Sequence, residues 1–193
     1  YLEMIYTNMS DLQQKVYNTI KTKESNDDNT ESLESTDIQQ RVQVSNIIYP
    51  SKILFNDDNL SSNFDIKNSY GETGLKRVIN IKDNKNFKVD YKDETIKNYG
   101  EIFNYKNIEK YSPKIKLLLD YIKNSEGIIL IYSKYIYSGI IPIALSLEHL
   151  GYNKYNNNNL FNKNSKNKLK NKGNYIIISG NSKLSPNNTK EIN

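Results

Sequence analysis

Two short stretches of the sequence place hydroxyl, amide and lysine side chains beside a glycine. Residues 133–139 (SKYIYSG) follow one apolar run, and residues 179–183 (SGNSK) follow another. Hydroxyl groups, lysine ammonium groups and the backbone N–H groups that glycine leaves accessible are common donors to phosphate oxygens. The first stretch also precedes an expected helix, whose positive N-terminal end favours an anion. The candidate phosphate-contacting residues are Ser133, Lys134, Ser138, Gly139, Ser179, Gly180, Ser182 and Lys183.

The same residue types are common in ordinary strand-to-helix turns, so that alternative stays open. Other chemistry has few candidates. The chain has no cysteine, which excludes disulfides, a thiol nucleophile and Cys-ligated zinc. Its single histidine, His149, excludes a multi-histidine metal centre and is expected to lie on the surface near a helix end. Neither a G-x-x-x-x-G-K-[ST] loop nor a G-x-G-x-x-G motif occurs. We therefore predict no catalytic residue and no metal ligand.

The second half of the chain predicts a unit of strand, helix and strand. Ser112 and Pro113 are typical of a helix start, and a stripe of apolar residues follows them. Residues 128–132 (IILIY) and 175–178 (YIII) are continuous apolar runs, which indicate buried strands of a parallel sheet. A helix is expected over residues 140–150, between them. Because ligands gather at the carboxyl ends of parallel strands, both candidate turns would lie at one edge of the sheet.

The first half is expected to be mostly helical and irregular. Ser10 and Gln13 have the spacing of a capping box, so a helix should begin there. A second helix is expected over residues 37–48, and residues 87–91 alternate as a strand does. The fold class is α/β, with a partial parallel-sheet lobe after a helical segment. We divide the chain into a connecting or insertion region, 1–104, with an acidic linker at 24–37, and the lobe, 105–193, with an Asn/Lys-rich insertion at 153–172.

Charge is unevenly distributed along the chain. Residues 1–100 hold 13 basic and 16 acidic side chains, whereas residues 101–193 hold 14 basic and 6 acidic ones. The linker and the insertion are interpreted as solvated segments, and the lysines of the insertion alternatively as a contact for nucleic-acid phosphates. No apolar run approaches the ~18–20 residues of a membrane span, so no membrane partner is predicted. An intracellular location is expected.

Five blocks of the second half resemble one family. They are residues 108–115 (IEKYSPKI), 125–133 (SEGIILIYS), 138–148 (SGIIPIALSLE), 175–180 (YIIISG) and 184–188 (LSPNN). Together they are similar to the start of the second RecA-like lobe in superfamily 2 helicases of large DNA viruses. These include Swi/Snf-like helicases, and their relatives include poxvirus-type nucleoside triphosphatases and early transcription factor large subunits.

The resemblance implies a piece of an ATP-driven motor. ATP and Mg²⁺ would be held mostly by an N-terminal helicase lobe of the same protein, and this piece alone would be inactive as an ATPase. Residues 132–134 and 179–182 match segments of the family that contact the nucleic-acid backbone. The eight candidate residues thus become nucleic-acid-binding, with DNA expected rather than RNA. A virion or a cytoplasmic viral factory would be the location. Arg41 and Arg77, the two arginines, do not match the family's arginine fingers.

Two alternatives stay open beside the motor. One is a helicase-like subunit of a viral transcription complex that binds without catalysis. The other is an unrelated nucleotide-binding α/β domain, such as a flavodoxin-like one, which would bind phosphate or flavin by itself.

Overall fold

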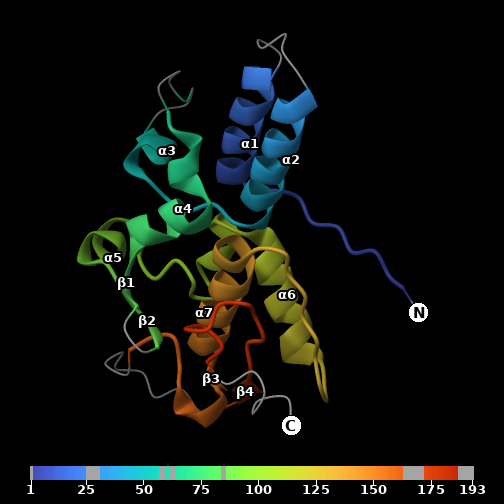
Figure 1. The fold of residues 1–193 in the computed structure, drawn as a ribbon, viewed down its shortest axis with the longest axis vertical. Coiled ribbons are helices and arrows are strands. Elements are labelled where there is room, and N and C mark those ends of the chain that lie inside the picture. Colours follow the sequence, from blue (N-terminus) through green and yellow to red (C-terminus); the bar gives the residue numbers. More distant parts are fainter. Residues whose placement is uncertain are drawn as a thin grey trace.

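The computed structural model describes residues 2–24, 31–56, 60, 64–83, 86–162 and 172–186. Figure 1 shows a pair of helices at one end, a hairpin with short helices beside it, and two longer helices behind the C-terminal segments. In chain order the elements are α1 Asp11–Glu24, α2 Glu31–Asn46, α3 Lys52–Asn56, the 3-10 turn η1 Ile66–Ser69, α4 Gly71–Val78, β1 Ile79–Asp83, β2 Phe87–Tyr91, α5 Asp93–Tyr99, the 3-10 turn η2 Ile108–Lys110, α6 Pro113–Asn124, the π-helical turn η3 Ile136–Ile140, α7 Ile141–Leu150, β3 Tyr152–Lys154, the 3-10 turn η4 Tyr155–Asn157 and β4 Gly173–Tyr175.

The helical pair α1 and α2 begins with the predicted capping box. The backbone N–H of Gln13 donates to Ser10 Oγ at 3.3 Å, and the N–H of Ser10 donates to Gln13 Oε1 at 3.2 Å. The buried amide of Gln13 also donates to the carbonyl of Val44 on α2, at 2.8 Å. Val16 and Ile20 pack with Val44 in a small core of their own. The capping box therefore both starts α1 and fixes it against α2.

The hairpin β1–β2 is antiparallel and confirms the strand expected at residues 87–91. Ile79 lies opposite Tyr91, and Asp83 lies opposite Phe87. Phe87 and Val89 are buried in the main core, while the other three residues of β2 are half-buried. The alternation seen in the sequence is thus used to bury one face of the hairpin.

Helices α6 and α7 also follow the sequence prediction. Ser112 Oγ accepts the backbone N–H of Ile115 at 3.0 Å, and Pro113 occupies the first turn of α6. Helix α7 ends at Gly151, whose φ of 98° lies in the left-handed region that glycine adopts without strain. The buried residues of both helices join one hydrophobic cluster with β2. This cluster is the main core of the molecule.

The predicted pairing of two buried strands is wrong. Residues 128–132 run without a bend beside α6 but belong to no sheet, and Leu130 and Tyr132 are 92% and 88% exposed. Strand β4 covers only the start of the second apolar run, and it pairs in parallel with β3 instead. An apolar run is buried on both faces only when neighbouring strands and helices cover it. Here nothing described covers the outer face of 128–132. Of its five residues only Ile131 packs against the main core, and Ile129 is 43% exposed.

The molecule is therefore a mixed α/β fold with one small antiparallel sheet and one small parallel sheet in the described residues. The segment predicted as a solvated insertion is partly folded. Leu160 is buried, and Lys154 is only 3% exposed, because its ammonium group donates to the carbonyl of Leu184 at 2.6 Å. Residues 163–171 of that insertion and 25–30 of the acidic linker lie outside the described residues. Residues 31–37 of the linker belong to α2.

Candidate nucleic-acid interface

The first candidate turn, residues 133–139, exposes one cation. Ser133 Oγ donates to the carbonyl of Tyr135 at 3.1 Å and accepts the N–H of Tyr135 at 3.3 Å. These two bonds close the turn and point the chain toward η3. Lys134 at its tip is exposed, and its Nζ lies 5.8 Å from the ring centre of Tyr135. An ammonium group in this position can reach a phosphate oxygen from solvent.

Ser138 and Gly139 of the same turn are buried and serve the scaffold. Ser138 Oγ accepts the N–H of Gly71 at 2.8 Å and donates to Gln43 Oε1 at 3.2 Å. A Cβ atom on Gly139 would lie 2.0 Å from Ser133 Oγ, so only glycine fits there. Ser138 joins η3 to α2 and α4, and Gly139 packs against Ser133 of the same turn. They position the turn, and the structure leaves them no access to a phosphate.

Two amide groups at the start of α7 are also occupied. The N–H of Ile140 donates to the carbonyl of Tyr135 at 3.0 Å, and the N–H of Ile141 donates to the carbonyl of Ile136. The π-helical turn η3 supplies these acceptors because it extends the helix backwards by one wide turn. The sequence-based expectation of an anion on these amides is therefore not supported by their geometry.

The second candidate turn, residues 179–183, is open to solvent and is held by side chains of residues 179–185. Asn181 Oδ1 accepts the backbone N–H groups of Lys183 and Leu184, at 3.0 and 3.1 Å. Ser179 Oγ lies 3.2 Å from Ser185 Oγ. A Cβ atom on Gly180 would meet nothing within 4 Å. The backbone is therefore accessible there, and the side chains of Ser182 and Lys183 are exposed.

The two turns are held by different parts of the fold. The first lies against α2 and α4 through Ser138, whereas the second is tied to the start of β2, where the N–H of Phe87 donates to the carbonyl of Lys183 at 3.3 Å. No hydrogen bond between described residues joins the two turns. The sequence placed both at one sheet edge because it paired residues 128–132 with 175–178, a pairing that the fold lacks.

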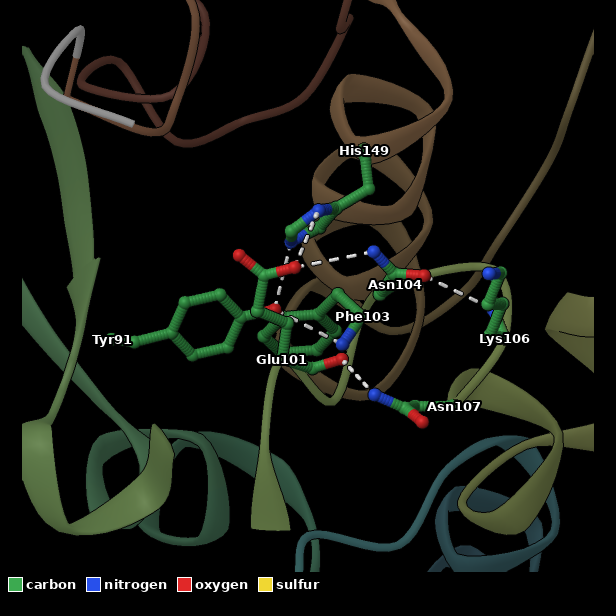
Figure 2. A network of polar contacts seen from close by, with 7 residues as sticks. All are labelled: Tyr91, Glu101, Phe103, Asn104, Lys106, Asn107 and His149. Carbon is green, nitrogen blue, oxygen red and sulfur yellow. Dashed lines mark hydrogen bonds and ion pairs between the residues drawn. The ribbon is translucent and has the colours of Figure 1, made fainter. Parts of the chain in front are cut away.

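A polar network that sequence reasoning missed lies around His149 (Figure 2). The hydroxyl of Tyr91 accepts the N–H of Phe103 at 3.0 Å and lies 2.9 Å from His149 Nε2. The hydroxyl can either donate to Nε2 or accept from it, because its oxygen has a second lone pair. Glu101 Oε2 lies 3.9 Å from His149 Nδ1, on the other side of the ring. Both ring nitrogens of His149 therefore face polar partners.

Burial controls the protonation of this network. It lowers the pKa of His149 below its usual 6.5, and the nearby carboxylate of Glu101 only partly opposes that shift by raising it. Burial likewise raises the pKa of Tyr91 far above 10.0. The ring of Phe161 packs 5.1 Å from the ring of His149. His149 was expected on the surface, but its side chain is 14% exposed. Its partner Tyr91 is 58 positions away, so no local pattern indicated the contact.

Glu148, the neighbour of His149 on α7, anchors two other segments. Its carboxylate accepts the N–H groups of Leu160 and Phe161, at 2.6 and 2.9 Å, and the hydroxyl of Tyr175. Burial raises the pKa of Glu148, and these three donors work in the opposite direction. The arrangement attaches residues 158–162 and β4 to α7. The role of Glu148 is structural, because both of its carboxylate oxygens accept hydrogen bonds from the chain itself.

A hollow of about 220 Å³ lies in the helical pair, away from both turns. None of the predicted site residues lines it; its walls are Ile20, Asp37, Gln40, Phe64, Asp65, Ile66 and Lys67. In the described part of the chain, no three His, Asp or Glu side chains are grouped as metal ligands would be. No helix there has the length and apolar character to cross a membrane.

Comparison with protein families, with curated proteins and with solved structures finds no match for this chain. A functional proposal therefore rests on the geometry of the two turns and on the sequence pattern of the second half.

Proposed function

We propose that the chain is a part of an ATP-dependent nucleic-acid helicase or translocase, with the role of second-lobe structure and of contacts with the sugar-phosphate backbone. The resemblance over residues 105–190 is one support. The other is the order of the elements: capped helix α6, an extended apolar stretch, a lysine turn, helix α7, the short strand β3, and strand β4, which pairs with β3 and leads to a second lysine turn. The resemblance implies such an alternation of extended stretches and helices, although the two apolar stretches are not paired with each other here.

The observation that carries the proposal is the exposure of a lysine at the end of each extended stretch. Lys134 and Lys183 both lie on the surface, next to Ser133 and Ser182 respectively, and Lys183 also lies near the open backbone at Gly180. The surrounding half of the chain holds 14 basic and only 6 acidic side chains. Such a surface attracts a polyanion, and each lysine that neutralises a phosphate releases a counterion.

The contact set is narrower than the eight residues proposed from sequence. Lys134, Gly180, Ser182 and Lys183 form the proposed surface. Ser133 and Ser179 hold the two turns in shape, and Ser138 and Gly139 hold η3.

ATP and Mg²⁺ belong to the proposed whole motor. The chain has no phosphate loop, and its two arginines lie on α2 and α4, so no step of ATP hydrolysis is assigned to its residues.

The salt dependence of DNA binding tests this proposal. Fluorescence anisotropy with labelled single-stranded DNA would be measured for the chain at several KCl concentrations. Lys134→Ala and Lys183→Ala should each reduce the slope of log K against log [KCl] by about 0.7 to 1. Lys110→Ala, an exposed lysine on η2, is the matched control and should leave the slope unchanged. Equal slopes for all three variants and the unmodified chain would remove the assignment.

A second titration separates this function from a nucleotide-binding domain. Flavin mononucleotide or inorganic phosphate should not saturate the chain, because the amides at the start of α7 are occupied. Saturable flavin binding would favour the flavodoxin-like alternative instead.

A further inference from the structure

The hollow of about 220 Å³ lies where α1, α2 and the chain around η1 meet. Its apolar lining is buried: Ile20, Phe64 and Ile66 are 2%, 4% and 7% exposed and belong to the small core of the helical pair. The volume equals that of several water molecules, since each takes up about 30 Å³ in the liquid. A small organic molecule therefore fits into the hollow.

Two polar side chains of α2 line the same hollow without a partner. Asp37 and Gln40 are three positions apart, so they lie on one face of the helix, and both are half-buried. Within the described residues, no hydrogen bond or ion pair uses the carboxylate of Asp37 or the side-chain amide of Gln40. A ligand that donates to these groups would gain hydrogen bonds that the chain itself does not make.

Asp65 adds a second carboxylate, which η1 holds in place. Its Oδ1 accepts the backbone N–H of Lys67 at 3.1 Å, and its Oδ2 accepts a side-chain N–H of Asn68 at 3.3 Å. Each oxygen keeps a lone pair, because a carboxylate has about four acceptor positions. Both carboxylates act on one region: burial raises the pKa of Tyr70, and the charges of Asp65 and then Asp37 raise it further. The hollow therefore combines a negative rim with an apolar lining.

These features together select a class of ligand. We propose that the hollow binds a small primary amine with an apolar body. An ammonium group has three N–H donors, and Asp37, Gln40 and Asp65 each offer it a side-chain oxygen. The apolar body lies against the three buried apolar side chains and replaces water there. An anion is repelled by the two carboxylates, and a neutral molecule forms weaker hydrogen bonds with them.

Lys67 should oppose the binding of a cation. Its side chain is exposed and also lines the hollow, so its ammonium group repels the ligand. The net charge of the chain is +5, so general electrostatic attraction does not favour a cation either. Saturable binding of an amine would therefore come from the local carboxylates. The hollow is away from both candidate turns, and this proposal does not depend on the proposed function.

Calorimetric titration of the chain with 2-phenylethylamine tests the proposal. This amine should give a saturable isotherm at neutral pH. The matched alcohol 2-phenylethanol has the same apolar body and should bind about ten- to hundredfold more weakly, because hydrogen bonds between charged groups are the stronger ones. The anion 3-phenylpropionate should not bind.

Variants of the lining test which groups hold the ammonium ion. Asp37→Asn keeps the shape of the side chain and should weaken amine binding about tenfold. Asp65→Asn should have a similar effect, since Asn caps a helix start as well as Asp does. Lys67→Met should tighten binding about two- to fivefold, because it removes a like charge at an exposed site. Asp93→Asn, at the start of α5 and outside the hollow, is the matched control and should have no effect.

Three results would overturn the proposal. Failure of 2-phenylethylamine to saturate the unmodified chain would show that the hollow is not an amine site. Equal binding of the amine and the alcohol would show that the carboxylates play no part in recognition. Unchanged affinity in both aspartate variants, each shown to be folded by circular dichroism, would place the ammonium group elsewhere.

Discussion

Strand β2 and the segment 128–132 are two five-residue stretches with opposite outcomes. The segment is apolar at every position, whereas β2 contains Lys88 and Asp90. Yet β2 pairs with β1 and buries Phe87 and Val89, while the more apolar segment stays open to solvent. The difference teaches that hydrophobicity decides how strongly a stretch favours burial, and a neighbouring partner decides whether burial happens. Strand β2 has that partner within one hairpin.

Truncation of one aromatic side chain in each stretch should break the comparison most clearly. Phe87→Ala removes a ring that is 5% exposed and should lower the free energy of unfolding by about 3–5 kcal/mol. Tyr132→Ala removes an exposed ring and should change the free energy of unfolding of the single chain by less than about 0.5 kcal/mol. Urea denaturation at a low protein concentration measures the free energy of unfolding of both variants. Similar losses would mean that residues 128–132 are packed in solution.

The turns that follow the two apolar runs should show a similar but smaller difference in stability between a buried and an open position. Gly139→Ala places a Cβ against Ser133 Oγ. It should lower the free energy of unfolding by about 1–3 kcal/mol, because the buried turn cannot expand freely. Gly180→Ala meets open space and should leave stability nearly unchanged. Thermal unfolding of both variants, monitored by circular dichroism, gives the comparison. A large loss of stability for G180A would contradict an open turn at residues 179–183.

The network around Tyr91 should have the smallest effect on stability, and this effect should depend on pH. Because burial lowers the pKa of His149 in the folded chain, the unfolded chain binds more protons below about pH 6.5, and stability falls as the pH falls through that value. Tm should therefore drop between about pH 7.5 and pH 5.5. His149→Gln should reduce that drop. Glu148, whose pKa burial raises, acts in the opposite direction at lower pH, since its folded form gains a proton first.

An unchanged pH profile in the His149→Gln variant would show that other groups control this range. The facing charged group is Glu101, and Tyr91 stays neutral throughout. A Glu101→Gln variant separates the effect of the Glu101 charge on the pKa of His149 from the effect of burying the ring. With Glu101 neutral, the pKa of His149 should fall further, and the loss of stability with acid should become larger.

Local elements of the fold could be predicted from sequence. The capping box at Ser10 and the helix start at Ser112 rest on hydrogen bonds over three residues, and the structure contains both. The alternation in β2 was equally informative, because its partner β1 lies a few residues before it. The candidate site was predicted only in part. Lys134 and Lys183 lie on the surface as expected. Ser138 is buried by contacts with α2 and α4 that no nearby residue indicated, and Gly139 is buried against Ser133 of the same turn.

The sequence by itself determined the positions of helix starts, the apolar character of the core segments and the excess of lysine in the second half. These properties depend on side-chain type and on spacings within one or two turns of chain. Only the tertiary structure decided which apolar run is covered, which serine is exposed to solvent and how deeply His149 is buried. Each of these depends on groups tens of residues away, and their approach depends on how the whole chain packs.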